Sequence, residues 1–351
     1  MRAMRALTIA PAEAGSLAVR DMPPPEPAPD EILVDALAVG VCGTDREIAA
    51  GMYGSAPPGE NRLVLGHESL GRVREAPDGS GFAAGDLVVG VVRRPDPVPC
   101  VACAHGEFDM CRNGRYVERG IKELHGYASE QWAVHRDYAV KVDAALGHLG
   151  VLMEPTSVVA KAWEQVERIG ARAYFDPQSV LVTGAGPIGL LAALLGAQRG
   201  LDVHVLDRVT GGVKPDLVRD LGATYHHDLD EALRKADPDI VIEGTGAPPL
   251  VYAVVRAVKP YGIVCLTGVS APGQRMEVQA GVVNRELVLD NAAVVGTVNA
   301  NQRHYQVAAD ALGAADAQWL RRLLTRRVPL EDFADAFAAR DDDVKVTLAF
   351  D

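Results

Sequence analysis

The residues best suited to chemistry are three candidate zinc ligands in separate parts of the chain. Cys42 lies in the segment GVCGTD, His67 in GHE and Glu154 in LMEP. A catalytic zinc ion takes three protein ligands and keeps one position open for substrate or water, and one Cys, one His and one Glu meet that requirement. Each also has a purely structural explanation. Cys42 could be a small buried side chain, His67 a hydrogen-bonded core residue, and Glu154 a charge that stabilises a helix N-terminus.

A second pattern, in the middle of the chain, is typical of a dinucleotide site. An apolar run from Ser179 leads into TGAGPIG, in which Gly184, Gly186 and Gly189 precede an apolar helical stretch. The first glycine permits a tight turn, the second lets the backbone approach a pyrophosphate, and the third lets helix and strand pack closely. Asp207, about 20 residues further on, can accept a hydrogen bond from the ribose 2′-hydroxyl. The alternative, a glycine-rich turn without a ligand, explains neither Asp207 nor the flanking elements.

The choice between NAD and NADP depends on two adjacent residues with opposite effects. Asp207 should repel a 2′-phosphate, whereas Arg208 could attract one. We expect NAD, with NADP as the alternative. The residues predicted to contact the cofactor are Gly184, Gly186, Pro187, Ile188, Gly189, Asp207, Arg208, Thr245 and Asn299.

The elements that must position these groups fall into two regions. Up to about residue 142, short β-branched or alternating runs are separated by Gly, Pro and Asp turns, which predicts an antiparallel, barrel-like β domain. The predicted strands cover residues 32–39, 63–65, 70–73, 87–92 and 131–134.

After residue 154 apolar runs alternate with helical patterns. Strands joined by helices pair in parallel, so this region predicts a doubly wound sheet. The tail from Asn301 predicts two or three short helices and a closing strand at 344–350 that returns to the β domain. The predicted strands are 180–183, 203–207, 239–243 and 263–267, and the predicted helices are 156–169, 188–199, 214–221 and 249–258.

Length and charge exclude several classes of function. The 351 residues are enough for two domains, each with its own core. The formal net charge of -12 disfavours nonspecific binding to nucleic acid or to an anionic membrane, because phosphate contacts need clustered Lys and Arg. The N-terminal segment lacks the apolar core of a secretion signal, and no apolar run approaches the roughly 18 residues that span a bilayer. We therefore expect a cytoplasmic protein.

Three of the five cysteines, Cys100, Cys103 and Cys111, lie close together in the sequence. An odd number of cysteines in a chain without a secretion signal is a poor disulfide framework, so metal ligation or simple burial is the better interpretation.

Taken in order, the CGTD, GHE, Glu-Pro and GAGPIG motifs resemble the zinc-containing medium-chain dehydrogenase superfamily over essentially the whole chain. The likeness is greatest to archaeal-type glucose 1-dehydrogenases, through RRP (93–95), GEFDMC (106–111), YVERGI (116–121) and VNAN (298–301). The resemblance implies an α/β fold with two domains. A GroES-like β-barrel catalytic domain would span 1–157, completed by about 298–351, and a Rossmann domain with a doubly wound parallel sheet would span 158–297.

The resemblance also implies a ligand set. Zinc would be held by Cys42, His67 and one of two carboxylates, Glu154 or Glu68, because relatives differ in the group that completes the shell. Asp45 would hold the ring and tautomer of His67, as metal-bound histidines usually require.

Further roles implied by the resemblance concern the substrate. Thr44 would contact the reacting hydroxyl and pass its proton outward, and with Asp45 and Glu68 it forms the predicted catalytic group. The residues expected near a sugar are Thr44, Glu118, Glu154 and Asn299.

Relatives with a structural zinc hold it with four cysteines on one lobe, and Cys100, Cys103 and Cys111 match three of them. The position of the fourth is Pro97, which has no ligand atom, so an all-cysteine tetrahedral site is excluded. Either Asp96, His105 or Asp109 substitutes, or the metal is absent.

The function implied is oxidation of a sugar hydroxyl, at C1 of a glucose-like aldose, with hydride passed to NAD(P) and a lactone as product. The alternative within enzymes is a zinc dehydrogenase of another polyol, an amino-sugar or cyclitol intermediate, or a simple alcohol. A dinucleotide-binding protein without catalysis is a remote alternative, and Cys42, Thr44, His67 and Glu154 count against it and against a zinc-free reductase. Relatives of this type lead us to expect a homodimer or homotetramer.

Overall fold

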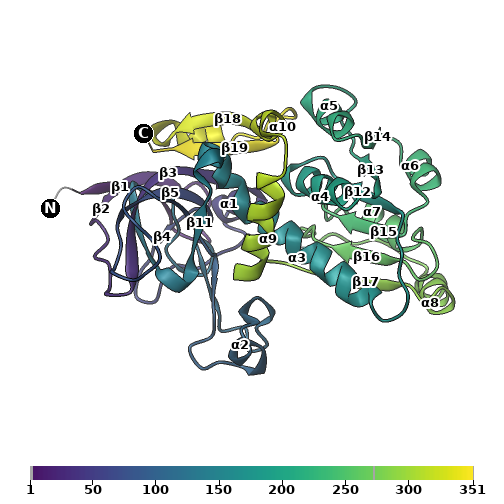
Figure 1. The fold of residues 1–351 in the computed structure, drawn as a ribbon, viewed down its shortest axis with the longest axis horizontal. Helices are drawn as coiled ribbons and strands as arrows, with labels where there is room; N and C mark the ends of the chain where they lie inside the picture. The colour runs from purple at the N-terminus through teal and green to yellow at the C-terminus, as the bar shows by residue number, and fades with distance from the viewer. Residues whose placement is uncertain (1–2, 272, 351) are drawn as a thin grey trace. The chain divides into compact units, whose positions relative to one another are not determined.

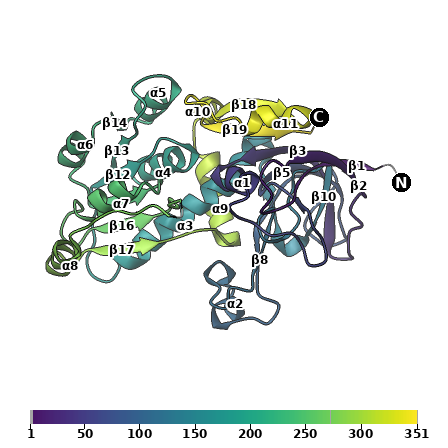
Figure 2. The same ribbon diagram turned by 180° about the vertical axis from the view of Figure 1, so that it is seen from behind.

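The computed structural model describes residues 3–271 and 273–350. The chain divides into two units, one formed by Met1–Ser157 with Asn299–Asp351 and the other by Val158–Val298. Figure 1 and, from behind, Figure 2 show the elements of each unit in chain order.

The long strand β3 (Glu31–Val41) organises the first unit. It pairs antiparallel with β5 (Glu68–Glu75), β10 (Gln131–His135) and β19 (Lys345–Ala349), so the last strand of the chain returns to the sheet of the first unit. Residues of β3 alternate between buried and half-buried positions until Val39. The sheet continues from β5 through β6 (Leu87–Gly90) to β11 (Ala139–Val142), and from β19 to β18 (Leu324–Pro329).

Most strand pairs of this unit are antiparallel, as predicted, but two are parallel. β18 pairs parallel with β19, and the segment that connects them contains the short helix α11 (Phe333–Phe337), as is usual for a parallel crossover. The other parallel pair is β8 (Val117–Arg119) with β9 (Glu123–Leu124). The remaining strands of the unit are β1 (Met4–Ile9), β2 (Ala18–Met22), β4 (Leu63–Val64) and β7 (Arg93–Arg94).

The helices of the first unit lie between its strands or in the C-terminal part of the chain. Besides α11, the helices are α1 (Gly43–Ala49), α2 (Val101–Ala104), α9 (Gln302–Gly313) and α10 (Ala317–Leu323), with 3-10 turns at Phe108–Met110, Arg136–Tyr138, Ala144–Leu152 and Leu330–Asp332. The segment around α2 projects from the strands of its unit as a separate lobe (Figures 1 and 2).

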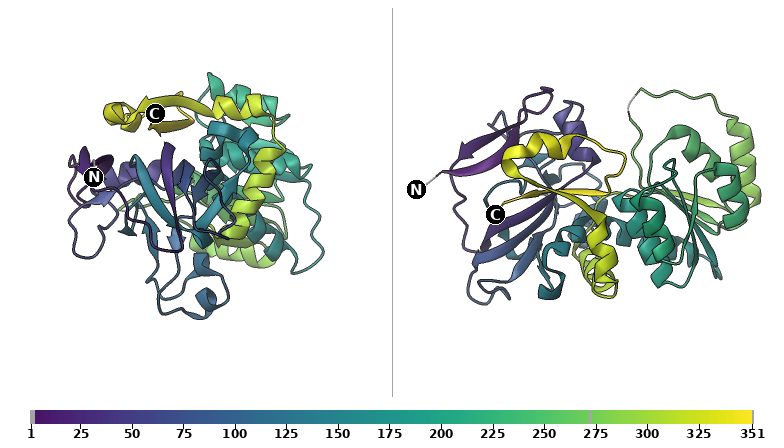
Figure 3. Two further views of the ribbon diagram at one scale, coloured as in Figure 1. Left: turned by 60° about the vertical axis from the view of Figure 1, so that its left-hand side comes forward. Right: turned by 90° about the horizontal axis from the view of Figure 1, so that it is seen from above.

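The second unit is a parallel sheet in the order β14-β13-β12-β15-β16-β17, which is the doubly wound arrangement predicted. Figure 3 shows helices on both faces of this sheet. The strands are β12 (Ser179–Thr183), β13 (Asp202–Leu206), β14 (Thr224–His226), β15 (Ile240–Glu243), β16 (Ile263–Leu266) and β17 (Ala293–Gly296). The helices are α4 (Pro187–Gln198), α5 (Val213–Asp220), α6 (Leu229–Ala236), α7 (Pro248–Val255) and α8 (Ala280–Leu289). Helix α3 (Met153–Gly170) begins in the first unit and continues into the second.

In the described residues no helix is both long enough and apolar enough to cross a bilayer.

Candidate functional site

The structure brings the first two predicted zinc ligands together. Cys42 follows the end of β3 and is the N-cap of α1, and its amide donates to Asp45 Oδ2 at 2.9 Å. His67 directly precedes β5, and its Nε2 lies 3.1 Å from Cys42 Sγ. The pairing of β3 with β5 therefore sets the distance between thiol and imidazole.

The opposite side of the His67 ring faces Asp45. Nδ1 of His67 lies 3.4 Å from Asp45 Oδ1, which is ion-pair distance but too long for a well-formed hydrogen bond. Neither atom has another partner among the described residues, although both are buried. This geometry is that of a carboxylate that orients a metal-bound histidine.

The negatively charged groups around His67 raise the pKa of its imidazole. Burial opposes a charged imidazole, but the negative charges of Cys42 and Asp45 outweigh burial and raise the pKa of His67 well above its ordinary value. Burial also opposes the ionised Asp45 carboxyl, and the attraction of His67 lowers the pKa of Asp45 in spite of it. The cluster thus attracts positive charge, which suits a cation.

Glu154 supplies a third ligand atom from the first turn of α3. The ligand atoms of His67, Glu68 and Glu154 lie within 4.8 Å of one another, as do those of Cys42, Asp45 and His67. Burial raises the pKa of Glu154 to about 7; the attraction of His67 opposes this shift and the repulsion of Glu68 adds to it. The Glu154 carboxylate makes no hydrogen bond or ion pair in the part of the chain that the structure describes.

The other candidate carboxylate, Glu68, is engaged by a lysine that the sequence analysis missed. Lys345, at the start of β19, places Nζ 2.6 and 2.5 Å from the two Glu68 oxygens, and both side chains are buried. A Cβ at Gly40 of β3 would overlap Glu68 Oε2, so the glycine makes room for this pair. Glu154 is therefore the freer of the two carboxylates to bind a metal.

These residues fit a catalytic zinc ion. His67 is common to two groups of ligand atoms, each within 4.8 Å: one with Cys42 and Asp45, the other with Glu68 and Glu154, so a thiol, an imidazole and a carboxylate are available around this histidine. Asp45 Oδ1 has no hydrogen bond and lies 3.4 Å from Nδ1 of His67. Thr44, half-buried in the first turn of α1, adds a hydroxyl beside the cluster.

The two residues expected near a sugar, Glu118 and Asn299, also meet in the first unit. Asn299 Nδ2 donates to Glu118 Oε1 at 2.6 Å, and Arg93 Nε and Nη2 donate to the same oxygen at 3.0 and 2.9 Å. Asn299 has a left-handed φ of 64°, which Asn tolerates better than most residues. All three hydrogen bonds are accepted by Oε1 of Glu118 and none by Oε2. We call Arg93, Glu118 and Asn299 the polar cluster.

The dinucleotide motif has the expected strand-turn-helix form in the second unit. Gly184 has a φ of 88°, and Gly186 is the N-cap of α4 with open space where a Cβ would lie. A Cβ at Gly189 would overlap the Gly184 carbonyl oxygen, so the third glycine permits the close approach of helix and turn. Pro187 and Ile188 form the first turn of the helix, whose N-terminus favours phosphate.

A pocket of about 510 Å³ lies next to this turn. Asp207 Oδ2 accepts from the Ala185 amide at 2.6 Å and Oδ1 from the Val209 amide at 3.1 Å, so two backbone donors share its charge. Thr245, which also lines the pocket, is held by the buried Glu243, which accepts from its amide at 2.8 Å. His227, which the sequence analysis did not single out, also lines the pocket. The lining residues are Gly184, Leu206, Asp207, Arg208, His227, Leu229, Thr245, Ala247 and Leu250.

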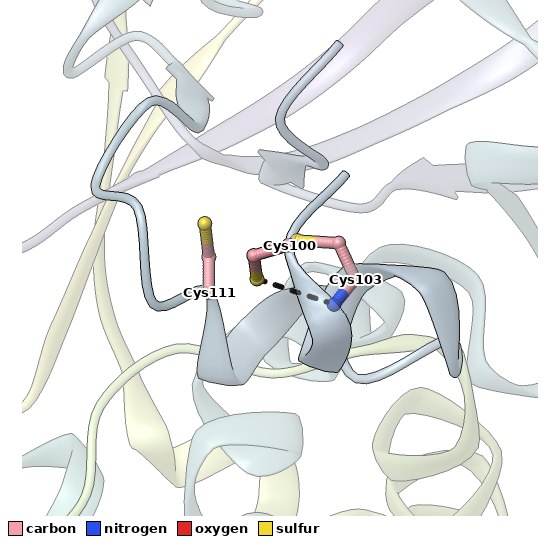
Figure 4. A group of neighbouring side chains, drawn as sticks. All are labelled: Cys100, Cys103 and Cys111. Atoms are coloured by element: carbon pink, nitrogen blue, oxygen red, sulfur yellow. Dashed lines mark hydrogen bonds between the residues drawn. The ribbon is translucent and has the colours of Figure 1, made fainter. Parts of the chain in front are cut away.

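The three cysteines of the lobe are brought together as well. Figure 4 shows Cys100, Cys103 and Cys111, whose sulfur atoms lie within 4.8 Å of one another. The amides of Arg112 and Cys103 donate to Cys100 Sγ at 3.3 and 3.5 Å and lower the pKa of that thiol to about 6. Burial, followed by the neighbouring thiols, raises the pKa of Cys103 to about 11.

The residues considered as a fourth ligand have other partners. Asp96 accepts from the Val98 amide at 2.9 Å and from Asn113 Nδ2 at 2.7 Å. His105 Nδ1 is 2.7 Å from the Val101 carbonyl oxygen, and Asp109 Oδ1 accepts from Asn301 Nδ2 at 2.7 Å. Within residues 3–271 and 273–350, no carboxylate or imidazole joins the three thiols at metal-binding distance.

Comparisons with known proteins identify the family of the chain. The chain matches the family models for the alcohol dehydrogenase GroES-like domain over residues 28–144 and for the glucose dehydrogenase C-terminus over residues 147–350. It is 39% identical to a glucose 1-dehydrogenase of Methanocella arvoryzae, with 98% of each chain covered. It is 40% identical to that of Thermoproteus tenax, covering 98% of this chain and 99% of the relative.

A solved structure shows the same likeness. Haloferax mediterranei glucose dehydrogenase, in complex with NADP, Zn and gluconolactone, matches with a TM-score of 0.91 and 35% identity over 99% of each chain.

Proposed function

The chain belongs to the glucose dehydrogenase family of zinc-containing medium-chain dehydrogenases, and we propose that it oxidises C1 of a glucose-like aldose to the lactone, with NAD(P) as hydride acceptor. The observation that carries the proposal is the buried polar cluster in the same unit as the Cys42–His67 pair. A sugar offers several hydroxyls that could bond to this cluster, whereas a simple alcohol offers only the hydroxyl that reacts. We place the reaction in the reducing cytoplasm, where thiols such as Cys42 stay available to a metal.

In this proposal Cys42, His67 and Glu154 hold zinc, and Glu68 pairs with Lys345 instead. The bound ion would supply Lewis acidity that lowers the pKa of a coordinated hydroxyl. Asp45 keeps the His67 ring in place, and the Thr44 hydroxyl accepts the proton of the sugar hydroxyl and passes it toward solvent. Glu118 orients the sugar through the oxygen that Arg93 and Asn299 leave open.

Glu118→Gln is expected to lower kcat/KM for glucose about 10- to 100-fold, mainly through a higher KM, because a hydrogen bond to a charged acceptor is worth about 1.5–3 kcal/mol. The KM of the dinucleotide should not change. The test is to measure steady-state kinetics of the variant and of the wild-type enzyme, each with glucose and with 2-deoxyglucose as substrate. Glu60→Gln, which alters an exposed carboxylate beside His125, is the matched control. Unchanged KM values for every aldose would refute the role of Glu118.

The proposal for the cofactor is that both NAD and NADP are accepted, with Asp207 limiting the use of NADP. Asp207→Asn keeps an acceptor for the Ala185 amide but removes the charge. Its kcat/KM for NADP relative to NAD should rise about tenfold, which corresponds to about 1.4 kcal/mol. Arg208→Ala should lower kcat/KM for NADP relative to NAD, because it removes the positive charge that attracts the 2′-phosphate. Asp216→Asn, on the exposed face of α5, is the control, and an unchanged ratio in Asp207→Asn would contradict the proposal.

We also propose that a second copy of the chain covers the edge strand β17. β16 occupies one side of β17, and the other side ends the sheet among the described residues. Apolar side chains are exposed along this edge, including Val288 and Leu289 of α8 and Val294 of β17. Proteins cover or blunt an open apolar edge, and a second copy would pair with it to give a dimer.

Val294→Lys is therefore expected to halve the molecular mass of the assembly, because a buried lysine would oppose pairing at the edge. Sedimentation of the wild type and variant measures the change. Val307→Lys, an equally exposed apolar position on α9, should leave the mass unchanged. Equal masses for all three proteins would rule out an interface at β17.

A further inference from the structure

The lobe that carries α2 does not fit the tetrahedral zinc site found in relatives, and we propose that its three thiolates bind a soft monovalent cation of the copper(I) class. The proposal concerns a site outside the reaction centre, and its success or failure does not depend on which substrate the enzyme oxidises.

The geometry of the three sulfurs supports a shared ion. Cys100, Cys103 and Cys111 place their sulfurs within 4.8 Å of one another. Three sulfurs around one ion at a bond length near 2.3 Å would be about 4 Å apart, so small side-chain rotations suffice. All three residues are half-buried, which leaves a route for an ion to enter the lobe.

Backbone donors already hold one of the three sulfurs in place. Two amides donate to Cys100 Sγ, from Cys103 at 3.5 Å and from Arg112 at 3.3 Å. These donors belong to the turn itself, so the lobe is arranged for a bound ion before one arrives.

The absence of a fourth protein ligand favours copper(I) over zinc at this site. Structural zinc is almost always four-coordinate, and the position that would supply the fourth ligand is Pro97. Asp96, beside it, directs both carboxylate oxygens to Val98 and Asn113, so it cannot turn to the sulfurs without losing two hydrogen bonds. Thiolates are soft ligands that select copper(I). This monovalent d¹⁰ ion can be three-coordinate, so the three cysteines complete its coordination shell.

The test is a competition titration of the zinc-loaded full chain under anaerobic, reducing conditions. Copper(I) is added in the presence of a coloured copper(I) chelator, and copper and zinc bound per chain are both measured. We expect one copper(I) per chain, with the bound zinc unchanged. Cys111→Ser should weaken copper binding at least 100-fold, whereas Cys265→Ser, a buried cysteine on β16, should not affect it.

X-ray absorption at the copper edge gives a second readout that does not depend on the variants' stability. Three copper–sulfur bonds would support the proposal. Copper binding that is undiminished in Cys111→Ser would place the ion elsewhere and overturn it. A second zinc per chain that resists the chelator and is lost in Cys111→Ser would also overturn it, because the lobe would then be a zinc site completed by a ligand from outside the chain.

Discussion

Cys42→Ser is expected to lower kcat/KM for the aldose by at least three orders of magnitude and to remove zinc from the chain. Serine keeps the size of the side chain but replaces the thiolate, which is one of the ligands that bind zinc well, with a hydroxyl that does not ionise. Three orders of magnitude correspond to about 4 kcal/mol of transition-state stabilisation. Metal content and steady-state kinetics of the purified variant measure both effects.

Cys265→Ser is the matched control for this experiment. Cys265 lies buried on β16 in the second unit, where its Sγ is 3.9 Å from the Ala162 carbonyl oxygen. The control should retain zinc and activity. If Cys42→Ser keeps wild-type zinc content and turnover, Cys42 is not a ligand and the site must be assigned to other residues.

Lys345→Met is expected to lower the free energy of unfolding by about 3–5 kcal/mol, because it leaves the buried Glu68 carboxylate without its partner. The double variant Lys345→Met/Glu68→Gln should recover most of that loss, since replacing both members of a buried pair removes the uncompensated charge. Urea unfolding of the wild type, both single variants and the double variant measures the coupling.

A surface pair provides the comparison. Lys141 Nζ lies 2.7 Å from Asp86 in a much more exposed setting, so Lys141→Met should cost less than about 1 kcal/mol. A loss in Lys345→Met no larger than that in Lys141→Met, or a double variant as unstable as the single, would show that the Lys345–Glu68 pair does not behave as a buried ion pair.

The fold class could be predicted because its signals are local. The apolar run, three glycines and following helix at residues 179–198 specify a strand, a tight turn and a helix within one short segment, and β12 and α4 form there. Regular alternation of strands and helices then requires a parallel sheet. The same reasoning missed β14 and β17, the two edge strands of the sheet, because neither is the fully buried apolar strand that β15 is.

The candidate site was only partly predictable because its contacts join distant segments. Lys345 and Glu68 are 277 residues apart and meet only because β19 and β5 flank the same strand. Likewise, the bond from Asn299 to Glu118 spans 181 residues. Motif spacing suggested which residues act, but the choice between Glu68 and Glu154 required the position of Lys345, which no local pattern reveals.

The central claim is tested most directly by turnover. The purified, metal-quantified protein is incubated with glucose, its epimers, polyols and simple alcohols, each with NAD and with NADP, and the absorbance of the reduced nicotinamide is followed. We predict rapid oxidation of glucose or a close epimer that is lost on chelation and restored by zinc. A protein that carries about one zinc per chain yet oxidises no aldose with either dinucleotide would contradict the account.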